Sequence, residues 1–469
     1  MSITIEIGKV YSKISGDYPV SALRKELSYL PRGYQFMPRY RMKQWDGRIH
    51  LMSIGGKFPS GLYPTVRKFL ISRNLKFQVK RVYRIPTVQD VMQPNNTKLR
   101  DYQLEAVRVA LKKTRGVLKQ PAGSGKTLVA SSIIKTLNRP TVFLTHKKDL
   151  LYQTKRVFEE EIGKDKIGLI GDGIVETNQI DIVSIPTISR TPTKFKSYFK
   201  RKEVLIADEV HHAQSNTWYK TIMQIPAMYR FGLTATPQSG DKFLLLEACT
   251  GKVIYTTEYG ELIKDKYLSK PKVLLLKVTK PDIPDRQEYQ TAYRDGIVQN
   301  KWRNRIIAGI AKKLCSLRLD PVCIITKFIE HGSNIEKEVS SVGLEDYRFI
   351  HGQHSAQERM EVIQNVLTGK VKVLITSPIF GEGVDIPPLR SMILASGGYS
   401  YIKVIQEAGR GMRSTESKSE VLIIDFFDDT HSYLLKHSKR RRNIYKSELL
   451  SKVTPPVYNS LDLLFENLY

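Results

Sequence analysis

Short apolar runs rich in β-branched residues alternate with amphipathic helical patterns from about residue 100 to residue 428. This alternation is typical of β–α–β units, in which helices connect parallel strands. The first set of predicted strands comprises 116–119, 141–145, 180–185, 204–207 and 231–234. The second set comprises 321–327, 347–350, 371–376, 391–395 and 421–426. The pattern therefore predicts an α/β fold with two parallel sheets in tandem.

The chain divides into parts that differ in this pattern. In residues 1–95, apolar positions are interleaved with aromatic and basic ones, and 17 Lys and Arg against 5 Asp and Glu leave a net charge of +12. Prolines mark 86–96 as a linker, and 259–284, rich in Lys and Pro, is interpreted as a hinge region. Three domains are expected: a small α+β N-terminal domain (1–92), a first α/β domain (93–265) and a second α/β domain with a basic helical C-terminal segment (266–469).

The net charge of the chain indicates what kind of partner it binds. Among 469 residues, 75 Lys and Arg outnumber 46 Asp and Glu, which leaves a formal charge of +29. Such an excess must be solvated or matched by a polyanion, and nucleic acid is the leading candidate. Three cysteines are too few for a disulfide framework, and none has zinc-type C-x-x-C spacing. Neither a signal peptide nor an apolar run of roughly 18 residues is present, so a cytoplasmic protein is expected.

A glycine-containing loop follows the first predicted strand. Residues 120–127 read Gln-Pro-Ala-Gly-Ser-Gly-Lys-Thr and lead into a helical pattern. Glycines let backbone N–H groups approach a phosphate, and the helix N-terminus adds its positive dipole end. Lysine then suits the β- and γ-phosphates and threonine suits Mg²⁺. The expected nucleotide-binding residues are Gly123, Ser124, Gly125, Lys126 and Thr127. A chance turn is the alternative, because Gln120 replaces the first glycine of the strict pattern.

Two carboxylates follow a later predicted strand. The apolar run 204–207 ends in Asp208 and Glu209. The carboxyl ends of parallel strands line the crevice in which open α/β sheets bind ligands. Asp208 is therefore expected to hold Mg²⁺, and Glu209 to orient or deprotonate the attacking water. Alone, such a pair is more often a solvated turn or a helix cap, but its position after the phosphate loop favours the metal and water site.

These segments resemble superfamily two helicases. Residues 99–103, Leu-Arg-Asp-Tyr-Gln, resemble the adenine-reading segment of that family, which implies nucleotide contacts by Arg100 and Gln103. In the helicase form of the phosphate loop the first glycine is commonly missing, so the departure at that position is no objection. Residues 208–211 spell the DEVH variant of the second motif, and the resemblance implies that His211 links the nucleotide and nucleic-acid sites.

Further motifs extend the resemblance to residue 413. They lie at 234–236, at 376 with 383–385, and at 406–413. The resemblance implies coupling by Thr234 and Thr236, a nucleic-acid contact by Thr376, nucleotide contacts by Gly383 and Asp385, and catalytic roles for Gln406, Arg410 and Arg413. A guanidinium from a second domain can stabilise the charge on the γ-phosphate, by up to roughly 10³ to 10⁵ in rate. Two RecA-like domains that bind Mg-ATP are thereby implied.

The N-terminal segment carries a narrower resemblance. The string Gly-Tyr-Gln-Phe-Met-Pro-Arg-Tyr at 33–40, followed by Trp-Asp-Gly-Arg-Ile at 45–49, resembles the small N-terminal domain of phage helicases of the UvsW type. This resemblance implies unwinding and branch migration of forks, Holliday junctions and strand-invasion or R-loop structures in recombination, repair and replication. It also implies a phage origin and, with it, the host cytoplasm.

Three basic segments could follow a phosphate backbone. Bases stack on aromatic faces for roughly 1 to 3 kcal/mol each, while cations neutralise phosphates. The expected nucleic-acid contacts are Lys147 and Lys148; Tyr34, Arg39, Tyr40, Trp45 and Arg48; and Lys439, Arg440, Arg441 and Arg442. Two alternatives stay open: the N-terminal rings could instead form the core of a small domain, and the basic run could be a solvated face.

The expected protein is an ATP-dependent DNA helicase or translocase that uses Mg²⁺ and functions as a monomer. Branched DNA is its expected partner, and RNA–DNA hybrids are further candidates. An RNA helicase, a duplex translocase that does not separate strands, and an ATP-gated DNA-binding module are the alternatives. The motifs contact ATP and the nucleic-acid backbone rather than bases, and fold alone does not fix function.

Overall fold

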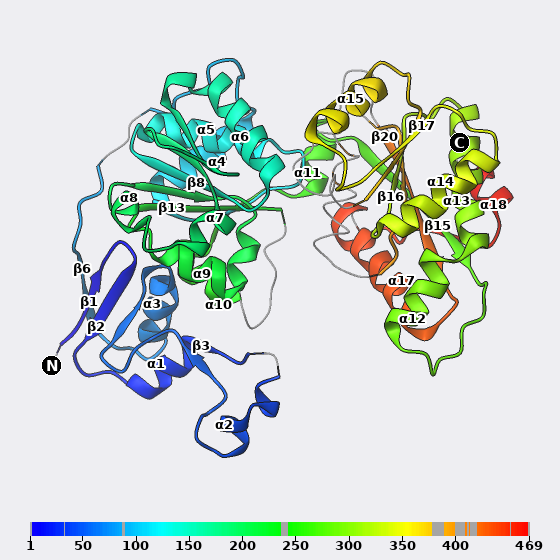
Figure 1. The fold of residues 1–469 in the computed structure, drawn as a ribbon. Coiled ribbons are helices and arrows are strands. Elements are labelled where there is room, and N and C mark those ends of the chain that lie inside the picture. The colour runs from blue at the N-terminus through cyan, green and yellow to red at the C-terminus, as the bar shows by residue number, and fades with distance from the viewer. Residues whose placement is uncertain are drawn as a thin grey trace. The chain divides into compact units, whose positions relative to one another are not determined.

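The computed structural model describes residues 2–31, 33–86, 90–235, 243–377, 389–398, 409, 412, 420–450 and 452–467 (Figure 1). The chain forms two compact units. The first comprises Met1–Gln120 and Gly125–Thr257, and the second comprises Pro121–Ser124 and Glu258–Tyr469.

The N-terminal part of the first unit is a small α+β domain. Its elements are β1 (Ile3–Ile7), β2 (Tyr11–Ser15), α1 (Val20–Glu26), β3 (Ser28–Tyr29), η1 (Tyr34–Phe36), α2 (Pro38–Arg41), β4 (Ile49–His50), β5 (Lys57–Pro59), η2 (Ser60–Leu62), α3 (Tyr63–Ile71) and β6 (Phe77–Arg81). The main sheet has the order β5-β2-β1-β6, with β1 and β6 parallel. Because side chains alternate along a strand, Ile3, Ile5 and Ile7 all enter the core, where they meet α1 and α3.

This small domain packs directly on the helix α10 (Phe243–Thr250) of the same unit. Gly61 in η2 comes so close that a Cβ there would lie 2.0 Å from the Glu247 carbonyl oxygen. Ala248 of α10 belongs to the core of the small domain. A residue without a Cβ is therefore required at this point of contact.

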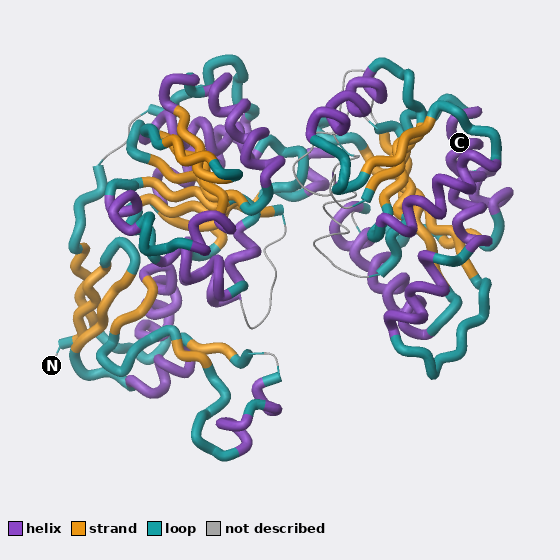
Figure 2. The backbone as a smooth tube through the Cα atoms, in the orientation of Figure 1, coloured by secondary structure: helices purple, strands orange, loops and turns teal. Residues whose placement is uncertain are grey.

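The rest of the first unit is a sheet with helices on both faces (Figure 2). The strands are β7 (Arg115–Lys119), β8 (Thr141–Thr145), β9 (Ile167–Gly171), β10 (Ile174–Glu176), β11 (Ile180–Ser184), β12 (Val204–Ala207), β13 (Tyr229–Thr234) and β14 (Val253–Thr256). The helices are α4 (Asp101–Lys113), α5 (Lys126–Leu137), α6 (Lys148–Glu161), η3 (Lys164–Lys166), α7 (Ile185–Arg190), α8 (Lys196–Lys200), η4 (Val210–Gln214) and α9 (Asn216–Met223). The strand order is β10-β9-β11-β8-β12-β13-β7-β14, and only the β9–β10 pair is antiparallel among the described strands.

The strand β12 shows why these segments read as continuous apolar runs. Leu205 and Ala207 pack into the core on one face of the sheet, while Val204 and Ile206 pack into the core on the other. A parallel strand covered by helices on both faces has no solvated side, so each position is apolar.

The second unit contains a sheet of the order β17-β18-β16-β19-β20-β15-β21, whose described pairs are all parallel. The strands are β15 (Lys270–Val278), β16 (Val322–Ile325), β17 (Tyr347–Ile350), β18 (Val373–Thr376), β19 (Ser391–Leu394), β20 (Glu420–Asp428) and β21 (Val457–Tyr458). The helices are α11 (Tyr259–Lys264), α12 (Tyr289–Tyr293), η5 (Arg294–Val298), α13 (Lys301–Ser316), α14 (Ile329–Ser341), α15 (Ala356–Leu367), α17 (Ser432–Ile444), η7 (Tyr445–Leu449) and α18 (Leu461–Glu466).

The predicted fold class is confirmed, and each predicted strand falls within one of the two large sheets. The predicted hinge at 259–284 is wrong, because it contains α11 and β15, and β15 pairs with both β20 and β21. Most of the buried residues of β15 come from the run 273–276, whose apolar pattern is hidden by the flanking Lys and Pro. The boundaries of the three domains stay a prediction. In the described part of the chain, no helix is long and apolar enough to cross a membrane.

Candidate nucleotide and nucleic-acid sites

The glycine loop joins β7 to the N-terminus of α5. Gly123 and Gly125 adopt left-handed backbone angles, with φ of 80° and 78°. Such angles strongly favour glycine. A Cβ at Gly125 would lie 2.4 Å from Gln103 Nε2, so the glutamine expected to contact adenine lies against the loop. The Gln103 Oε1 also accepts a hydrogen bond of 2.9 Å from the backbone N–H of Arg100, which precedes α4 and is exposed.

Lys126 and Thr127 are the first two residues of α5, and both are half-buried. Ser124, just before the helix, is buried. At this end of a helix, free N–H groups and the helix dipole favour an anion. The side-chain amide of Gln120 is fully buried, and neither of its polar atoms has a partner among the described residues. A buried amide of this kind fits a site that receives a polar ligand.

Asp208 and Glu209 follow β12, which is separated from β7 by β13. The Asp208 backbone N–H donates to the Leu144 carbonyl (2.9 Å), and the Glu209 N–H donates to Asp208 Oδ1 (3.0 Å). Glu209 has a left-handed φ of 46°, which is uncommon for a residue with a Cβ and recurs at functional sites. Burial, and next the Glu209 charge, raises the pKa of Asp208 to about 6, while the Lys126 ammonium opposes that shift.

His211 connects the acidic pair to the end of β13. Its Nδ1 lies 3.1 Å from Thr234 Oγ1 and 3.2 Å from Glu209 Oε2. Both His211 and Thr234 are buried. Glu209, His211 and Thr234 therefore form one connected polar chain. That His211 links the nucleotide and nucleic-acid sites stays a prediction.

Two residues of this region were missed by the sequence analysis. His146 follows β8, and its ring centroid lies 4.4 Å from that of His212, which lies 5.3 Å from the ring of Trp218. The His146 ring lies close enough to Asp208 to lower the pKa of that carboxyl group whenever the ring is protonated. A position directly after a central parallel strand is the signal that could have identified His146. Nothing local marks Trp218, because it reaches the cluster from α9.

The residues present fit Mg-ATP. Thr127 offers a hydroxyl and Asp208 a carboxylate, and Mg²⁺ prefers oxygen ligands with one or two carboxylates completed by phosphates and water. The described residues contain no group of three or more His, Cys, Asp or Glu that could hold a metal. A Mg-ATP site does not need such a group, because phosphates and water complete the coordination. Six residues of the predicted site lie outside the described residues: Thr236, Gly383, Asp385, Gln406, Arg410 and Arg413.

The N-terminal rings expected to contact DNA lie outside the core of their domain, which is built from other residues. Tyr34 and Tyr40 pack edge to face at 4.9 Å, and both are half-buried. The Trp45 indole N–H donates to the Arg48 carbonyl (2.8 Å), and Arg48 Nε donates to Ser28 Oγ (2.7 Å). These rings therefore do not form the core of the small domain. They lie at its surface, where contacts with one another and with the backbone hold them in place.

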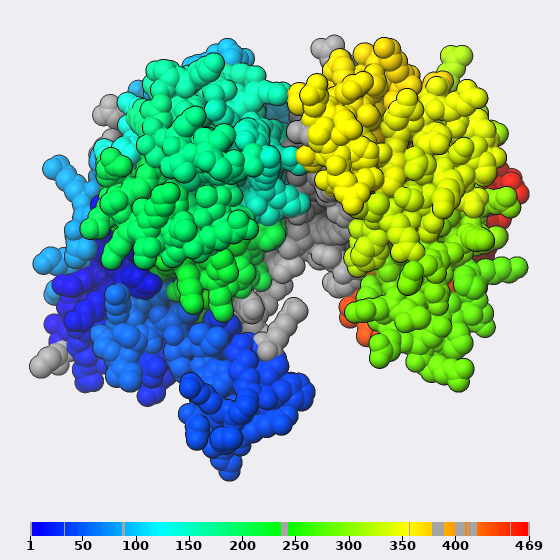
Figure 3. Space-filling view, viewed as in Figure 1, coloured from blue at the N-terminus to red at the C-terminus, as the bar shows by residue number. Residues whose placement is uncertain are grey.

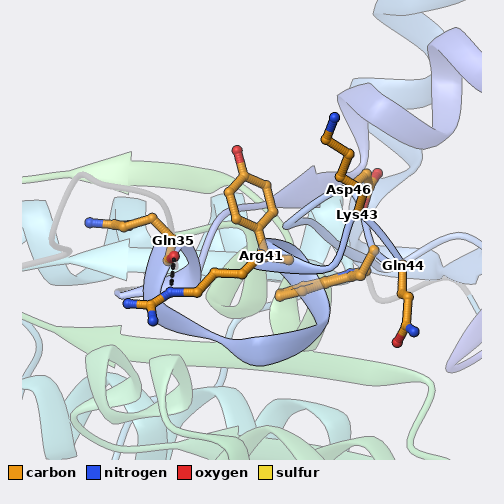
Figure 4. A pocket seen from close by; sticks show the side chains of 7 residues that line it. Gln35, Arg41, Lys43, Gln44 and Asp46 are labelled. Atoms are coloured by element: carbon orange, nitrogen blue, oxygen red, sulfur yellow. Dashed lines mark hydrogen bonds between the residues drawn. The ribbon is translucent and has the colours of Figure 1, made fainter.

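These rings belong to a projecting segment, residues 33–48, that carries α2 away from the rest of the N-terminal domain (Figure 3). Arg39 on α2 is exposed. A hollow of about 610 Å³ opens on the segment, lined by Gln35, Tyr40, Arg41, Lys43, Gln44, Trp45 and Asp46. Figure 4 shows Arg41 extended across it, with its Nε 3.5 Å from the Gln35 carbonyl oxygen. Basic and amide side chains thus surround aromatic rings on this surface.

The other expected contacts fall into different environments. Lys147 caps α6 and is half-buried, whereas Lys148 is exposed and its Nζ lies 2.7 Å from Asp172 Oδ2. On α17, Lys439 and Arg440 are exposed. Arg442 is half-buried, and its Nε donates to the Pro455 carbonyl (2.9 Å).

Two of the expected nucleic-acid contacts are corrected by the structure. Arg441 is 3% exposed; its Nε donates to Asp425 Oδ2 and its Nη1 to the Gly398 carbonyl, at 2.8 and 2.7 Å. Thr376 is 1% exposed, and its hydroxyl donates to the Ser377 carbonyl (2.9 Å). Both side chains face the interior of the second unit, so neither can reach a phosphate backbone without rearrangement.

Three family models match this chain. Residues 96–239 match the Type III restriction enzyme res subunit, residues 320–415 the helicase conserved C-terminal domain, and residues 9–80 the N-terminal domain of DNA helicase UvsW. The first two cover the predicted motifs up to residue 413, and the third covers the N-terminal segment with the narrower resemblance.

Known proteins resemble the chain along most of its length. It is 23% identical to the ATP-dependent DNA helicase UvsW of Enterobacteria phage T4, with 93% of this chain and 95% of that protein covered. It is 26% identical to the DNA 3'-5' translocase XPB2 of Sulfurisphaera tokodaii, with 81% and 92% covered. The solved structure of the DNA-bound restriction-modification enzyme LlaBIII matches with a TM-score of 0.60 and 19% identity, over 80% of this chain and 32% of that one, which shows a shared fold.

Proposed function

The chain is a superfamily two helicase of the UvsW type, and from that premise we propose that it unwinds and branch-migrates branched DNA. Forks, Holliday junctions and strand-invasion or R-loop structures are the proposed substrates, and recombination, repair and replication the proposed processes. We further propose that it works as a monomer in the host cytoplasm, with the three domains bounded at 1–92, 93–265 and 266–469.

The match of residues 9–80 to the UvsW N-terminal model carries the choice of substrate. The ATP motifs are shared with helicases of many kinds, whereas this domain belongs to a narrower group. Its contact with α10 through Gly61 supports the proposal, because it attaches the small domain to the part of the first unit that contains β7 and α5.

For ATP hydrolysis, we assign the roles by position. Lys126 at the start of α5 binds the β- and γ-phosphates, and Thr127 and Asp208 hold Mg²⁺. When bound, Mg²⁺ supplies charge that neutralises the phosphate oxygens. Glu209 orients the attacking water, and the polar chain through His211 to Thr234 senses its position. Gln406, Arg410 and Arg413 are proposed to stabilise the charge that develops on the γ-phosphate.

The proposed DNA contacts are those expected residues whose side chains are exposed or half-buried. They are Lys147, Lys148, Tyr34, Arg39, Tyr40, Trp45, Arg48, Lys439, Arg440 and Arg442. Cations neutralise phosphates and rings offer stacking faces, without dependence on sequence.

Stimulation of ATP hydrolysis tests this proposal. The wild-type rate is measured with single-stranded DNA, duplex DNA, a fork, a four-way junction and RNA of matched length, and strand displacement is measured on the duplex, the fork and the junction. The largest stimulation and displacement are expected on branched DNA. Preference for RNA would overturn the substrate, and stimulation by duplex DNA without displacement would favour a duplex translocase. Lys126→Ala should abolish hydrolysis, whereas Lys135→Ala on the same helix should preserve it.

A further inference from the structure

The second unit carries a cluster of aromatic rings on one part of its surface. Tyr289 on α12 lies 5.9 Å from Tyr293, 6.0 Å from Tyr433 and 5.2 Å from His437, measured between ring centroids. Tyr293 lies 5.8 Å from Phe328, the residue that caps α14. The rings come from α12, from α17 and from the start of α14, and α12 contacts α17 directly (Figure 1). Segments far apart in sequence therefore build one aromatic surface.

Two of these rings are exposed but held in place. Phe328 is 45% exposed and Tyr433 is 46% exposed. Tyr433 stacks on His431, with 25° between the planes, while the edge contacts of Tyr289 and Tyr293 fix Tyr433 and Phe328. Exposed rings gathered in one patch mark interaction sites more often than isolated ones do. A rigid support beneath them reduces the entropy that a ligand loses on stacking.

The ring cluster is also surrounded by positive charge. Lys327 Nζ lies 4.7 Å from the Tyr293 ring centroid and 4.8 Å from that of Phe328. Lys436 and Arg440 are exposed on the same helix as Tyr433. A ligand that contacts the rings therefore also meets these cations, which favour an anion.

Two acidic side chains near the cluster, those of Asp285 and Glu330, have partners of their own. Asp285 accepts a hydrogen bond from the Ser432 N–H (3.0 Å), and Glu330 accepts one from Gln299 Nε2 (2.9 Å) and lies 3.4 Å from Arg294. Burial lowers the pKa of His437, and the charges of Arg441, Arg440, Lys436 and Lys327 lower it further.

We propose that this face binds an unpaired DNA strand, whose bases stack on Phe328 and Tyr433 while its phosphates meet Lys327, Lys436 and Arg440. Flat π-faces next to cations are the combination that single-stranded nucleic acid uses, and a duplex keeps its bases stacked inside. The inference rests on the proposed DNA-directed function. The basic run on α17 was proposed to contact DNA through charge alone. The ring cluster would add a site at which bases stack.

Equilibrium binding to matched oligonucleotides tests the site. Tyr433→Leu and Phe328→Leu remove the flat ring but keep an apolar side chain, whereas Tyr433→Phe keeps the ring. Each Leu variant should bind single-stranded DNA at least about fivefold more weakly than wild type, as expected for loss of one stacked base, and Tyr433→Phe should bind as wild type does. Trp302→Leu, which removes a ring that is 44% exposed on α13, serves as the matched control. Melting curves establish that each variant is folded.

An abasic oligonucleotide of equal length separates stacking from charge. It presents the same phosphates without bases, so wild type and the two Leu variants should bind it equally. Equal losses on abasic and normal DNA would overturn the stacking site, as would Leu variants that bind normal DNA as wild type does. Equal losses on RNA and DNA, with no unwinding of branched DNA by wild type, would instead refute the proposed function and leave a general strand-binding site.

Discussion

At the scale of single residues, Arg441 joins two carboxylates inside the second unit. Its guanidinium lies 2.8 Å from Asp425 and 3.6 Å from Asp428, and Asp428 also pairs with the buried Arg303 at 2.8 Å. Loss of one partner from such a network leaves a buried charge without compensation, at a cost of about 3–5 kcal/mol. We therefore expect Arg441→Ala to lower the free energy of unfolding by about that amount, measured by chemical denaturation.

The control for this prediction lies two residues away. Lys439 is exposed on the same helix, so Lys439→Ala should change stability by no more than about 0.5 kcal/mol. Similar, small effects of the two substitutions would contradict the assignment of Arg441 to the interior. The residue is therefore expected to govern stability and to affect DNA binding only through it.

His437 provides a prediction about pH. Burial, and then the charges of Arg441, Arg440, Lys436 and Lys327, lowers the pKa of His437 to about 4. A histidine in the unfolded chain has a pKa of about 6.5. Between about pH 4 and pH 6.5 the unfolded chain therefore binds more protons than the folded protein does. The contribution of neutral His437 is full above about pH 6.5 and is lost as pH falls toward 4. The melting-temperature difference between wild type and His437→Gln should shift against wild type over that window. A constant difference would show that the imidazole titrates normally.

At the scale of elements, Gly61 tests how the N-terminal domain is attached. A Cβ at this position would lie 2.0 Å from the Glu247 carbonyl oxygen of α10, so Gly61→Ala must displace one of the two backbones. We expect a loss of about 1–3 kcal/mol in the free energy of unfolding and faster proteolysis of the N-terminal domain. Gly55→Ala is the control, because the nearest atom to a Cβ there lies 4.0 Å away. Equal protease resistance of both variants would contradict the rigid contact.

Elements could be predicted from the sequence where a pattern is local. The strands 141–145 and 204–207 have the predicted bounds, because parallel strands buried on both faces are unbroken apolar runs. The strand β15 was missed, since Lys and Pro flank its apolar centre. The contact of η2 with α10 could not be predicted, because it depends on two backbones distant in sequence.

The same division applies to the site. The glycine loop and the acidic pair are short strings whose residue types state their chemistry, and the structure brings Gln103 against the loop and His211 between Glu209 and Thr234. The basic run on α17 shows the limit of such strings. Which cations face solvent depends on the partners inside, and the carboxylates of β20 draw Arg441 inward.

At the scale of the whole molecule, the central claim is that ATP hydrolysis drives the movement of branched DNA. The most direct measurement follows a four-way junction with mobile arms in real time, with ATP and with a non-hydrolysable analogue. Wild type should resolve the junction into duplex products with ATP alone, Glu209→Gln and Lys126→Ala should not, and Lys135→Ala should match wild type. A junction that stays intact while wild type hydrolyses ATP, or that moves equally with the analogue, would contradict the account.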